Sequence, residues 1–415
     1  MTTLDYRDHA LHLERVALAA VAELFGTPCY VYSRAAIEAA YRAYDSAFGA
    51  TAHRVCYAVK ANSNLAVLNV LARLGAGFDV VSGGELARVL RAGGKANRVV
   101  FSGVGKSTEE LRQALAAGIA CFNVESAAEL ERLNQVATEL GLRAPVALRV
   151  NPDVDAGTHP YISTGLKENK FGIPADDALA LYRRAASLPG LRVYGVACHI
   201  GSQMTDLAPL REAAGRIAAL RLTLLAEDIA IDHVDLGGGL GIAYRHEVVP
   251  SATDYAAAIG EPFAGSGVEI SIEPGRSIVG PAGVLLTRVE YLKPGAGRNF
   301  AIIDAAMNDL LRPALYDAHH AVLPLRQAGG QTKVWELVGP VCESGDFLAH
   351  ARSLALAEGD VLALRDAGAY GFAMSSNYNT RPRPPEVMVD GDKAYLIRAR
   401  ETLDDLWRGE EMLAN

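Results

Sequence analysis

The chain has 415 residues, half of them hydrophobic and 7% aromatic, which is typical of a soluble α/β enzyme with a large core and two domains. A net charge of −8 gives no support to a nucleic-acid partner, and five cysteines without a C-x-x-C pair favour a reduced protein over a disulfide framework. No uncharged apolar run reaches membrane-spanning length and the N-terminus lacks a signal-peptide core, so we expect a cytoplasmic protein that does not enter a membrane.

The N-terminal part of the chain contains two helical patterns separated by a strand. Residues 10–25 have the apolar spacing of an amphipathic helix, which Gly26 and Pro28 would stop. The segment PCYVYS (28–33) predicts an isolated strand, and a helix is expected from about 35 to 48.

From residue 54 onward, strand-like runs alternate strictly with helical stretches. The eight runs are RVCYAVKA (54–61), GFDVVSGG (77–84), RVVFSGV (98–104), CFNVES (121–126), PVALRVN (145–151), RVYGVACHIG (192–201), HVDLGGG (233–239) and EISIEPG (269–275). A doubly wound sheet is the competing architecture, but eight repeats over this length favour a (β/α)8 TIM barrel.

From Gly283 onward the sequence contains β-type runs separated by Pro and Gly turns. These runs are GVLLTRVEYL (283–292), NFAIIDAA (299–306), KVWELVGPV (333–341), DVLALRDAG (360–368), EVMVD (386–390) and KAYLIRARE (393–401). They predict a mostly antiparallel β domain, a barrel or sandwich, which the strand at 28–33 is expected to join. The predicted domains are therefore a barrel over 34–281 and a β domain over 1–33 and 282–415.

Polar side chains stand at the C-terminal ends of the predicted barrel strands, where the chemistry of such barrels takes place. In chain order they are Lys60, Asp79, Ser102, Glu125, Asn151, His199, the glycines 237–239 and Glu273. Each alone has a structural interpretation: a lysine reaching water, acids capping helices, a histidine satisfied in the core. Together they predict an active site around Lys60, an amine that can attack a carbonyl from a partly dry pocket.

Two glycine-rich turns resemble nucleotide-binding motifs but fail their spacing. DLGGGLG (235–241) suits a phosphate, yet Ile242 breaks the dinucleotide pattern. SGVGKST (102–108) has Val100 where a P-loop needs its first glycine, and we interpret Lys106 as solvated. A dehydrogenase or NTPase is therefore not favoured.

The turn EPGRS (273–277) offers a carboxylate that could keep a pyridine nitrogen protonated and, in Arg276, an anion clamp. For this segment alone, a plain turn with a surface ion pair is the alternative interpretation.

Three further segments lie in the predicted β domain. Cys342 stands beside acids in VGPVCESGDFLA (338–349), and a long polar loop occupies 366–387. Arg312 and Tyr316 would share a face if NDLLRPALY is helical. The pair His319-His320 has no partner spacing that supports zinc, so no metal is predicted.

The motifs YAVKAN (57–62), HIGSQ (199–203), GGGLGI (237–242), EPGR (273–276), CESGD (342–346) and GAYG…MSSNYN…RP together resemble the alanine-racemase-fold pyridoxal-phosphate decarboxylases (fold type III). The resemblance extends over about residues 27–400, and the joint set of motifs is specific. It implies that pyridoxal 5′-phosphate is the cofactor. It also relates the segment 158–172 to the family's flexible loop after the fifth strand.

The resemblance assigns roles residue by residue. Lys60 would form the Schiff base, His199 would stack on the ring, Glu273 would pair with the ring nitrogen, and Asp79 would border the cofactor. The phosphate would be bound by Gly238, Gly239, Gly275, Arg276, Ser202 and Tyr370.

In this family the active site lies at a dimer interface, so a homodimer with shared sites is implied. The CES segment would come from the other subunit. Cys342 would then reprotonate Cα, and Glu343 would contact the distal ammonium of the substrate.

The choice of substrate depends on a fixed cation, because a second carboxylate distinguishes diaminopimelate from lysine, ornithine and arginine. Arg312, with Arg276, Tyr316 and Tyr370, fits that need. The expected reaction is meso-2,6-diaminopimelate to L-lysine and CO2, the last step of lysine biosynthesis. The alternatives are a lysine, ornithine or arginine decarboxylase, or a pyridoxal-phosphate-binding protein without turnover.

Overall fold

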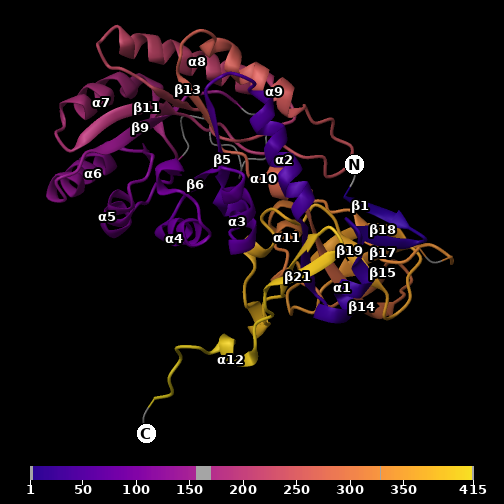
Figure 1. Ribbon diagram of the computed structural model, residues 1–415. Helices are drawn as coiled ribbons and strands as arrows, with labels where there is room; N and C mark the ends of the chain where they lie inside the picture. Colours follow the sequence, from indigo (N-terminus) through magenta and orange to yellow (C-terminus); the bar gives the residue numbers. More distant parts are fainter. Residues whose placement is uncertain (1–2, 156–169, 328, 414–415) are drawn as a thin grey trace. The chain divides into compact units, whose positions relative to one another are not determined.

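The computed structural model describes residues 3–155, 170–327 and 329–413 (Figure 1). The chain divides into two compact units, 38–243 with 247–277, and 1–37 with 244–246 and 278–415. We call the first the barrel unit and the second the β unit, and describe each by itself. In the described part of the chain, every helix is too short or too polar to cross a membrane.

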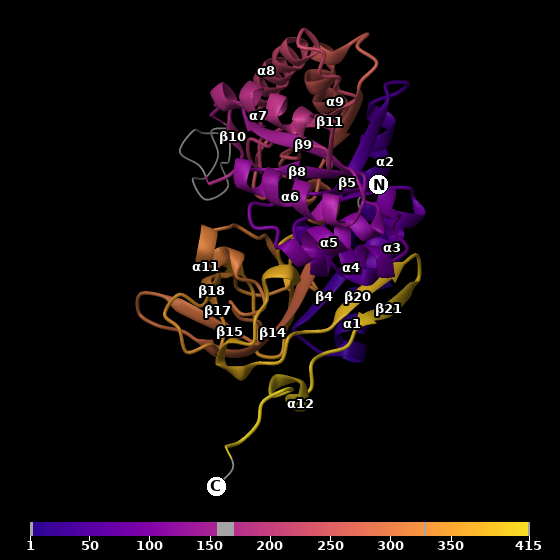
Figure 2. The same ribbon diagram turned by 90° about the vertical axis from the view of Figure 1, so that its left-hand side faces the viewer.

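Eight parallel strands among the described residues of the barrel unit form a closed barrel, which confirms the predicted fold (Figure 2). They are β5 (His53–Ala58), β6 (Gly77–Val80), β7 (Val99–Phe101), β8 (Cys121–Val124), β9 (Ala144–Asn151), β11 (Leu191–Ala197), β12 (His233–Asp235) and β13 (Glu269–Ile272). The barrel closes where β13 pairs with β5 and where β8 pairs with β9. A short strand β10 (Ile173–Pro174) extends the sheet beside β9. The C-terminal ends of the eight strands therefore meet at one mouth.

The barrel strands form because their residues are buried on both faces. Every residue of β6, β7 and β8 is buried, as expected for short apolar strands in a parallel sheet. The helices that follow the strands are α3 (Leu65–Arg73), α4 (Gly83–Arg91), α5 (Thr108–Ala117), α6 (Ala127–Glu139), α7 (Ala175–Ser187), α8 (Ala208–Leu225) and α9 (Ala252–Gly260). Serines 82, 107, 126 and 251 cap four of them, each accepting a hydrogen bond from a backbone N–H of the first turn. Figure 2 shows α6, α7 and α8 outside the strands.

The β unit contains a large mixed sheet and a small N-terminal one. The large sheet contains β4 (Cys29–Ser33), β14 (Gly283–Lys293), β15 (Asn299–Ile303), β16 (Val322–Pro324), β17 (Lys333–Val338), β18 (Phe347–Leu354), β19 (Val361–Leu364), β20 (Glu386–Asp390) and β21 (Lys393–Arg398). Most pairings are antiparallel, as predicted, although β15 with β17 and β20 with β4 are parallel. The strand predicted at 28–33 is β4, and it joins this sheet between β14 and β20.

Further helices lie at the boundaries between the units along the chain and within the β unit. A helix predicted at about 35–48 is α2 (Arg34–Ala47), and α10 (Arg276–Val279) follows the last barrel strand. In the β unit α11 (Arg312–Tyr316) and α12 (Leu403–Leu406) are each about one turn long.

The predicted helix at 10–25 is wrong over its first half. A hairpin of β1 (Leu4–Arg7) and β2 (Ala10–Leu13) precedes β3 (Val16–Ala17), and the helix α1 is confined to Leu18–Phe25. Asp8 and His9 adopt positive φ angles of 46° and 64°, which form the turn. Leu11 and Leu13 are buried on one side of β2, a period of two that a helical spacing had concealed.

Candidate active site

Lys60 lies at the mouth of the barrel in a single 3-10 turn, Val59–Ala61, directly after β5. Its Nζ donates a hydrogen bond to Asp79 Oδ2 at 2.7 Å, and the Lys60 side chain keeps 35% of its surface exposed while Asp79 has none. The second oxygen, Oδ1 of Asp79, is buried without a hydrogen-bond partner. An amine is therefore held at an accessible position above a buried carboxylate.

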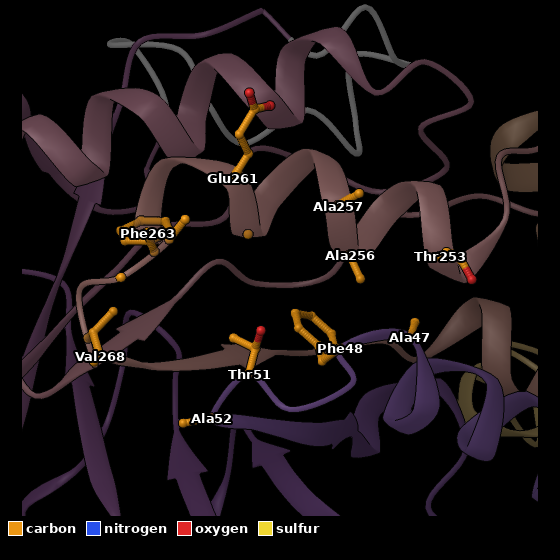
Figure 3. A pocket seen from close by; sticks show the side chains of 14 residues that line it. Ala47, Phe48, Thr51, Ala52, Thr253, Ala256, Ala257, Glu261, Phe263 and Val268 are labelled. Atoms are coloured by element: carbon orange, nitrogen blue, oxygen red, sulfur yellow. The ribbon is translucent and has the colours of Figure 1, made fainter.

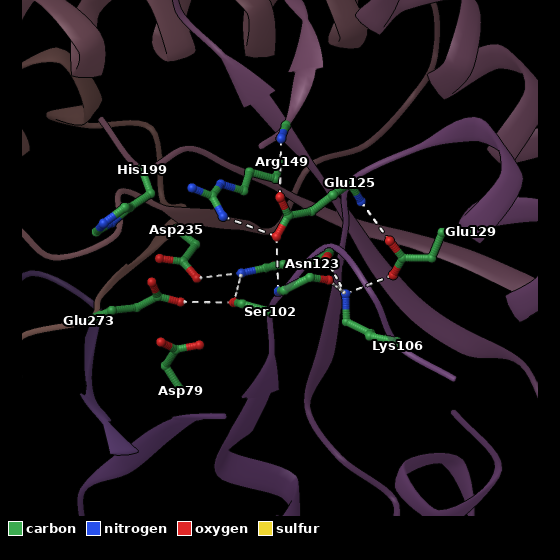
Figure 4. Close-up of polar contacts among 12 residues, drawn as sticks. Asp79, Ser102, Lys106, Asn123, Glu125, Glu129, Arg149, His199, Asp235 and Glu273 are labelled. Carbon is green, nitrogen blue, oxygen red and sulfur yellow. Dashed lines mark hydrogen bonds and ion pairs between the residues drawn. The ribbon is translucent and has the colours of Figure 1, made fainter. Parts of the chain in front are cut away.

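Glu273 follows β13 and is buried at the same mouth. Ser102 Oγ donates to Glu273 Oε1 at 3.4 Å, and Asp235, the last residue of β12, lies beside it (Figure 4). Burial raises the pKa of Glu273 well above its usual range, and the neighbouring Asp235 and Asp79 raise it further. Glu273 is thus a group that holds a proton inside the barrel.

His199 follows β11 and contacts the glycine turn after β12. The N–H of Gly238 donates to His199 Nδ1 at 3.2 Å. Burial lowers the pKa of His199 well below its usual range, and the positive charges of Arg149 and Lys60 lower it further. The imidazole is therefore neutral at physiological pH. The Gly238 N–H therefore already donates to a side chain. That Gly238 binds the phosphate stays a prediction.

The glycines at this mouth are required by close backbone approach. A Cβ on Gly238 would lie 2.2 Å from the carbonyl oxygen of Glu273, and one on Gly275 would lie 3.0 Å from the Cβ atoms of Ala58 and Ala61. Backbone hydrogen bonds join the same segments: Glu273 N–H donates to Gly237 O at 2.7 Å, and Ala58 N–H donates to Pro274 O at 3.1 Å. The ends of β5, β12 and β13 are thereby held together around Lys60 and Glu273.

Arg276 begins α10 and is buried. Its Nε and Nη2 donate to Ser202 Oγ at 3.4 and 3.2 Å. The backbone of Gly275, the guanidinium of Arg276 and the hydroxyl of Ser202 therefore lie next to one another.

A buried polar network surrounds these groups, and most of it was not predicted (Figure 4). Asn123 Nδ2 donates to Asp235 Oδ2 at 3.0 Å and to Ser102 Oγ at 3.2 Å. Arg149 Nη1 donates to Glu125 Oε1 at 3.0 Å. Asn123, Arg149 and Asp235 carry polar side chains inside buried strands, and that conflict with a buried strand was the signal available in the sequence.

The interpretation of Lys106 as solvated is wrong. Its Nζ donates to Glu129 Oε1 at 2.7 Å, to Gly103 O at 2.9 Å and to Asn123 O at 2.8 Å, and its side chain is 1% exposed. Three acceptors satisfy the three ammonium protons, so burial of this lysine is compensated.

Arg312 and Tyr316 lie in the β unit at the two ends of α11, so the last five residues of NDLLRPALY are helical. Arg312 is buried and donates from Nη1 to His320 Nε2 at 3.0 Å, while its Cζ lies 4.7 Å from the ring centroid of Tyr244. Tyr316 is half-buried. The guanidinium is therefore held by two neighbours before any ligand arrives.

Cys342 and Glu343 lie in the exposed loop between β17 and β18. The N–H of Cys342 donates to Asn379 Oδ1 at 2.8 Å, and Asp346 accepts from the backbone N–H groups of Val341 and Met307 at 2.8 and 2.7 Å. Cys342 is the exposed one of the five cysteines, whereas the other four are buried. The loop thus presents a thiol and a carboxylate from a fixed backbone.

Tyr370 lies in the long loop between β19 and β20. It has a φ of 55°, an uncommon conformation for an aromatic residue that often accompanies function. The backbone at Tyr370 is therefore in the left-handed region, and the predicted role of its hydroxyl stays a prediction.

His319 and His320 make structural hydrogen bonds. His319 Nδ1 contacts Tyr244 O at 3.0 Å, and His320 Nδ1 contacts Arg365 O at 2.7 Å. Within residues 3–155, 170–327 and 329–413 there is no group of His, Cys, Asp and Glu placed to hold a metal ion.

A cavity of about 500 Å³ lies at the other end of the barrel (Figure 3). Thr51 and Ala52, which line it, precede β5, and Val268 precedes β13, so the cavity lies at the N-terminal ends of the strands. It is lined mainly by alanine, glycine and phenylalanine and lacks the polar set found at the mouth. It is therefore not the candidate site.

The predicted site residues fall into two groups. Lys60, Asp79, His199, Ser202, Gly238, Gly239, Glu273, Gly275 and Arg276 belong to the barrel unit, and Arg312, Tyr316, Cys342, Glu343 and Tyr370 belong to the β unit. Of the predicted loop 158–172, residues 158–169 lie outside the described residues.

Comparison with known proteins agrees with this arrangement. Residues 34–280 match the family described as pyridoxal-dependent decarboxylase, pyridoxal binding domain. A diaminopimelate decarboxylase from Pseudomonas aeruginosa is 62% identical over 413 residues and is covered completely, as is this chain. The structure of diaminopimelate decarboxylase from Helicobacter pylori complexed with L-lysine has a TM-score of 0.91 at 44% identity, covering 94% of this chain and 98% of that one. The enzyme of the same name from M. jannaschii, in complex with L-lysine, has a TM-score of 0.95 at 40% identity, covering 99% and 98%.

Proposed function

This chain belongs to the diaminopimelate decarboxylases, a group of pyridoxal-dependent decarboxylases, and we propose that it converts meso-2,6-diaminopimelate to L-lysine and CO2. The reaction is the last step of lysine biosynthesis. The observation that carries the proposal is the meeting of Lys60, Asp79, His199 and Glu273 at one barrel mouth in a chain that matches its relatives over the full length. L-Lysine, bound in two solved relatives, is the expected product.

The residues at the mouth fit pyridoxal 5′-phosphate. Lys60 has the accessible amine for the covalent link, and Glu273 holds a proton where a pyridine nitrogen needs an acidic partner. The neutral His199 has a ring suited to stacking, and a buried Asp79 oxygen still lacks a hydrogen-bond partner. The turn at Gly275, which a Cβ would crowd, and the Arg276 guanidinium suit a phosphate.

The chemistry supplied by the bound cofactor is an electron sink for the breaking Cα–carboxylate bond. Glu273 would support positive charge on the ring nitrogen, and Asp235 and Ser102 hold Glu273 in place. His199 would lie against the ring without adding charge. The Cys342 thiol donates the proton to Cα after CO2 has left, a role supported by its exposure on a fixed loop.

Substrate recognition requires a cation for the carboxylate that is not lost. Arg312 supplies it, with Arg276, Tyr316 and Tyr370 as further contacts, and Glu343 binds the distal ammonium. Lysine and ornithine lack a second carboxylate, so Arg312 is the basis of selectivity against them. A charged Arg–carboxylate hydrogen bond contributes about 1.5–3 kcal/mol, roughly a tenfold to hundredfold preference.

The two domains have different proposed roles. The barrel over 34–281 binds the cofactor, and the β domain over 1–33 and 282–415 contributes substrate-binding and catalytic residues. The protein is a homodimer in which Cys342 and Glu343 complete the site of the partner subunit. It works in the cytoplasm. The exposure of Cys342 and Glu343, which leaves both side chains accessible to a second subunit, supports the shared site.

The test is a side-by-side assay of CO2 release from diaminopimelate, lysine, ornithine and arginine. We expect diaminopimelate to have the largest kcat/KM, and Arg312→Ala to lower that value by roughly tenfold to a hundredfold. Arg312→Lys is the matched control, because it retains charge but not the bidentate fork. An unchanged kcat/KM in Arg312→Ala would contradict the role of Arg312 in selecting diaminopimelate.

A second measurement tests the cofactor link. The purified protein should show the visible absorbance of lysine-linked pyridoxal phosphate, and Lys60→Ala should lose it. Persistence of that absorbance in Lys60→Ala would refute the assignment of Lys60. A protein that binds the cofactor in this way but releases no CO2 from any of the four amino acids would be the non-catalytic alternative.

A further inference from the structure

Arg312 is held by a compact group of side chains within the β unit. Its Nη1 donates to His320 Nε2 at 3.0 Å, and its guanidinium lies over the Tyr244 ring at 4.7 Å. The rings of Tyr244 and His320 pack edge to face, with centroids 5.6 Å apart at an angle of 79°. Each of the three side chains therefore touches the other two.

The hydrogen bonds of His320 determine its tautomer. Nδ1 lies 2.7 Å from Arg365 O, and because a carbonyl only accepts, Nδ1 carries the proton. Nε2 is then the acceptor that Arg312 needs. Protonation of both nitrogens would turn an N–H toward a guanidinium, so the neutral ring is the form that fits this arrangement.

The sheet fixes the position of His320. The imidazole is fully buried, and His320 lies two residues before β16, which pairs with β19. Arg365, the acceptor of the Nδ1 proton, directly follows β19, and its N–H donates to Ala321 O at 2.9 Å. The backbone carbonyl of His320 also accepts from Arg352 Nη2 at 3.2 Å. The backbone of His320 and the carbonyl of Arg365 therefore fix the ring, and with it the position of Nε2.

We propose that His320 is a positioning residue for substrate selection, which together with Tyr244 orients the Arg312 guanidinium toward the distal carboxylate of the substrate. The inference rests on the proposed function, since it deepens the role of Arg312. A long arginine side chain loses rotamer freedom when it binds a carboxylate, and a guanidinium fixed in advance loses less. His320 and Tyr244 thus contribute to affinity without contacting substrate.

The test compares two ligands of the holoenzyme that differ by the carboxylate in question. L-Lysine retains the carboxylate that decarboxylation leaves, whereas 1,5-diaminopentane has none. Calorimetry should show that His320→Leu weakens L-lysine binding by about tenfold, the scale of one hydrogen bond to a charged group, with 1,5-diaminopentane changed less than about twofold. His320→Gln retains an acceptor and should recover most of the lysine affinity.

Two comparisons separate positioning from general damage. Tyr244→Leu should weaken L-lysine selectively while Tyr244→Phe, which keeps the aromatic face, should not, and this pair decides the matter if His320→Leu does not fold. His350→Leu removes another histidine hydrogen bond of the β unit, 2.8 Å to Glu336, and should change neither affinity. Equal weakening of both ligands, or of neither, would overturn the inference. Absence of turnover with diaminopimelate would instead refute the proposed function, since these binding measurements do not depend on turnover.

Discussion

Glu273 is the residue whose environment is most clearly adapted to chemistry rather than to stability. Replacing it by glutamine keeps its shape but removes the titratable proton that would support positive charge on the ring nitrogen. We expect Glu273→Gln to retain the cofactor and to lower kcat by about 10²–10⁴-fold, the scale of a lost proton-holding group. Steady-state kinetics beside the cofactor absorbance measures both. A kcat within twofold of the wild type would contradict the role of Glu273.

The same substitution should stabilise the cofactor-free protein. Because burial and Asp235 raise the pKa of Glu273 in the folded state, the folded protein binds this proton more tightly than the unfolded chain does. The stability that the group contributes is present below its unfolded pKa, about 4.3, and is lost as pH rises toward the folded value. The Tm of Glu273→Gln should therefore exceed that of the wild type near pH 7 and approach it near pH 4. If the difference in Tm between Glu273→Gln and the wild type grew as the pH fell, the pKa of Glu273 would not be raised in the folded state.

At this scale, sequence reasoning identified residues at strand ends and missed those within strands. Lys60, Asp79, His199 and Glu273 follow apolar runs, and the barrel geometry brings such positions together. Lys106 was misread because its partner Glu129 is 23 residues away, and no local pattern reveals that both are buried.

Among the elements, the buried pair Lys106–Glu129 connects the loop after β7 with the first turn of α6. Lys106→Met leaves Glu129 buried without its cation, which should cost about 3–5 kcal/mol. Adding Glu129→Gln should restore part of that loss, because the double variant buries no charge. Urea unfolding of the single and double variants measures the coupling between the two positions.

An exposed ion pair is the matched control for that experiment. Arg183 and Glu227 join α7 to the turn after α8, with side chains 57% and 32% exposed. Arg183→Ala should cost less than about 1 kcal/mol. Equal costs for Lys106→Met and Arg183→Ala would mean that burial does not decide the contribution of these pairs.

The turn after β12 is packed too closely against the turn after β13 to accept a side chain at Gly238. In Gly238→Ala the new Cβ would lie 2.2 Å from the Glu273 carbonyl oxygen, so one of the two turns must move. If the overpacking cost of about 1–3 kcal/mol falls on the cofactor-bound state, cofactor affinity drops by about fivefold to a hundredfold. Gly215→Ala, where a Cβ on α8 meets open space, should leave affinity unchanged and stabilise the helix by about 0.5–1 kcal/mol. Equal cofactor affinity in the two variants would argue against the role of the turn.

The strands and helices could be predicted where the spacing of their apolar residues was regular. Each of the eight barrel strands begins within one residue of the start of a predicted run, because short strands buried on both faces alternate with capped helices. The hairpin at 4–13 was missed since its strands have four residues each, too few to distinguish a period of two from a helical spacing. The short β16 was also missed, for the same reason. The strand β18 was missed although it has eight residues, because most of them are half-buried or exposed and show no apolar run.

At the scale of the whole molecule, the proposed site draws on residues that the chain separates into two units. Lys60 and Glu273 belong to the barrel unit, whereas Arg312, Cys342 and Tyr370 belong to the β unit. A sequence can assign each group to its unit but contains no pattern that fixes how a loop such as 342–346 reaches a barrel mouth. The family resemblance supplied that idea, and it requires a second copy of the chain.

Complementation between two inactive variants tests the shared site directly. Lys60→Ala lacks the amine of the barrel unit, and Cys342→Ala lacks the thiol of the β unit, so each homodimer should be inactive. If Cys342 serves the partner subunit, a mixed dimer has one site with both defects and one site with neither. Random exchange of subunits in an equimolar mixture should then restore about a quarter of wild-type activity, since half of the dimers are mixed and each has one intact site.

The control for complementation pairs Lys60→Ala with Glu273→Gln. Both residues belong to the barrel unit and serve the same site, so each mixed dimer has one defect in each of its two sites and no site is complete. This mixture should show no more activity than the average of its two parents. Recovery in the Lys60→Ala and Cys342→Ala mixture alone would establish that the site is completed across subunits. No recovery, in a mixture whose subunit exchange is verified by mass spectrometry, would instead place Cys342 in the site of its own chain, and a monomer could then be active.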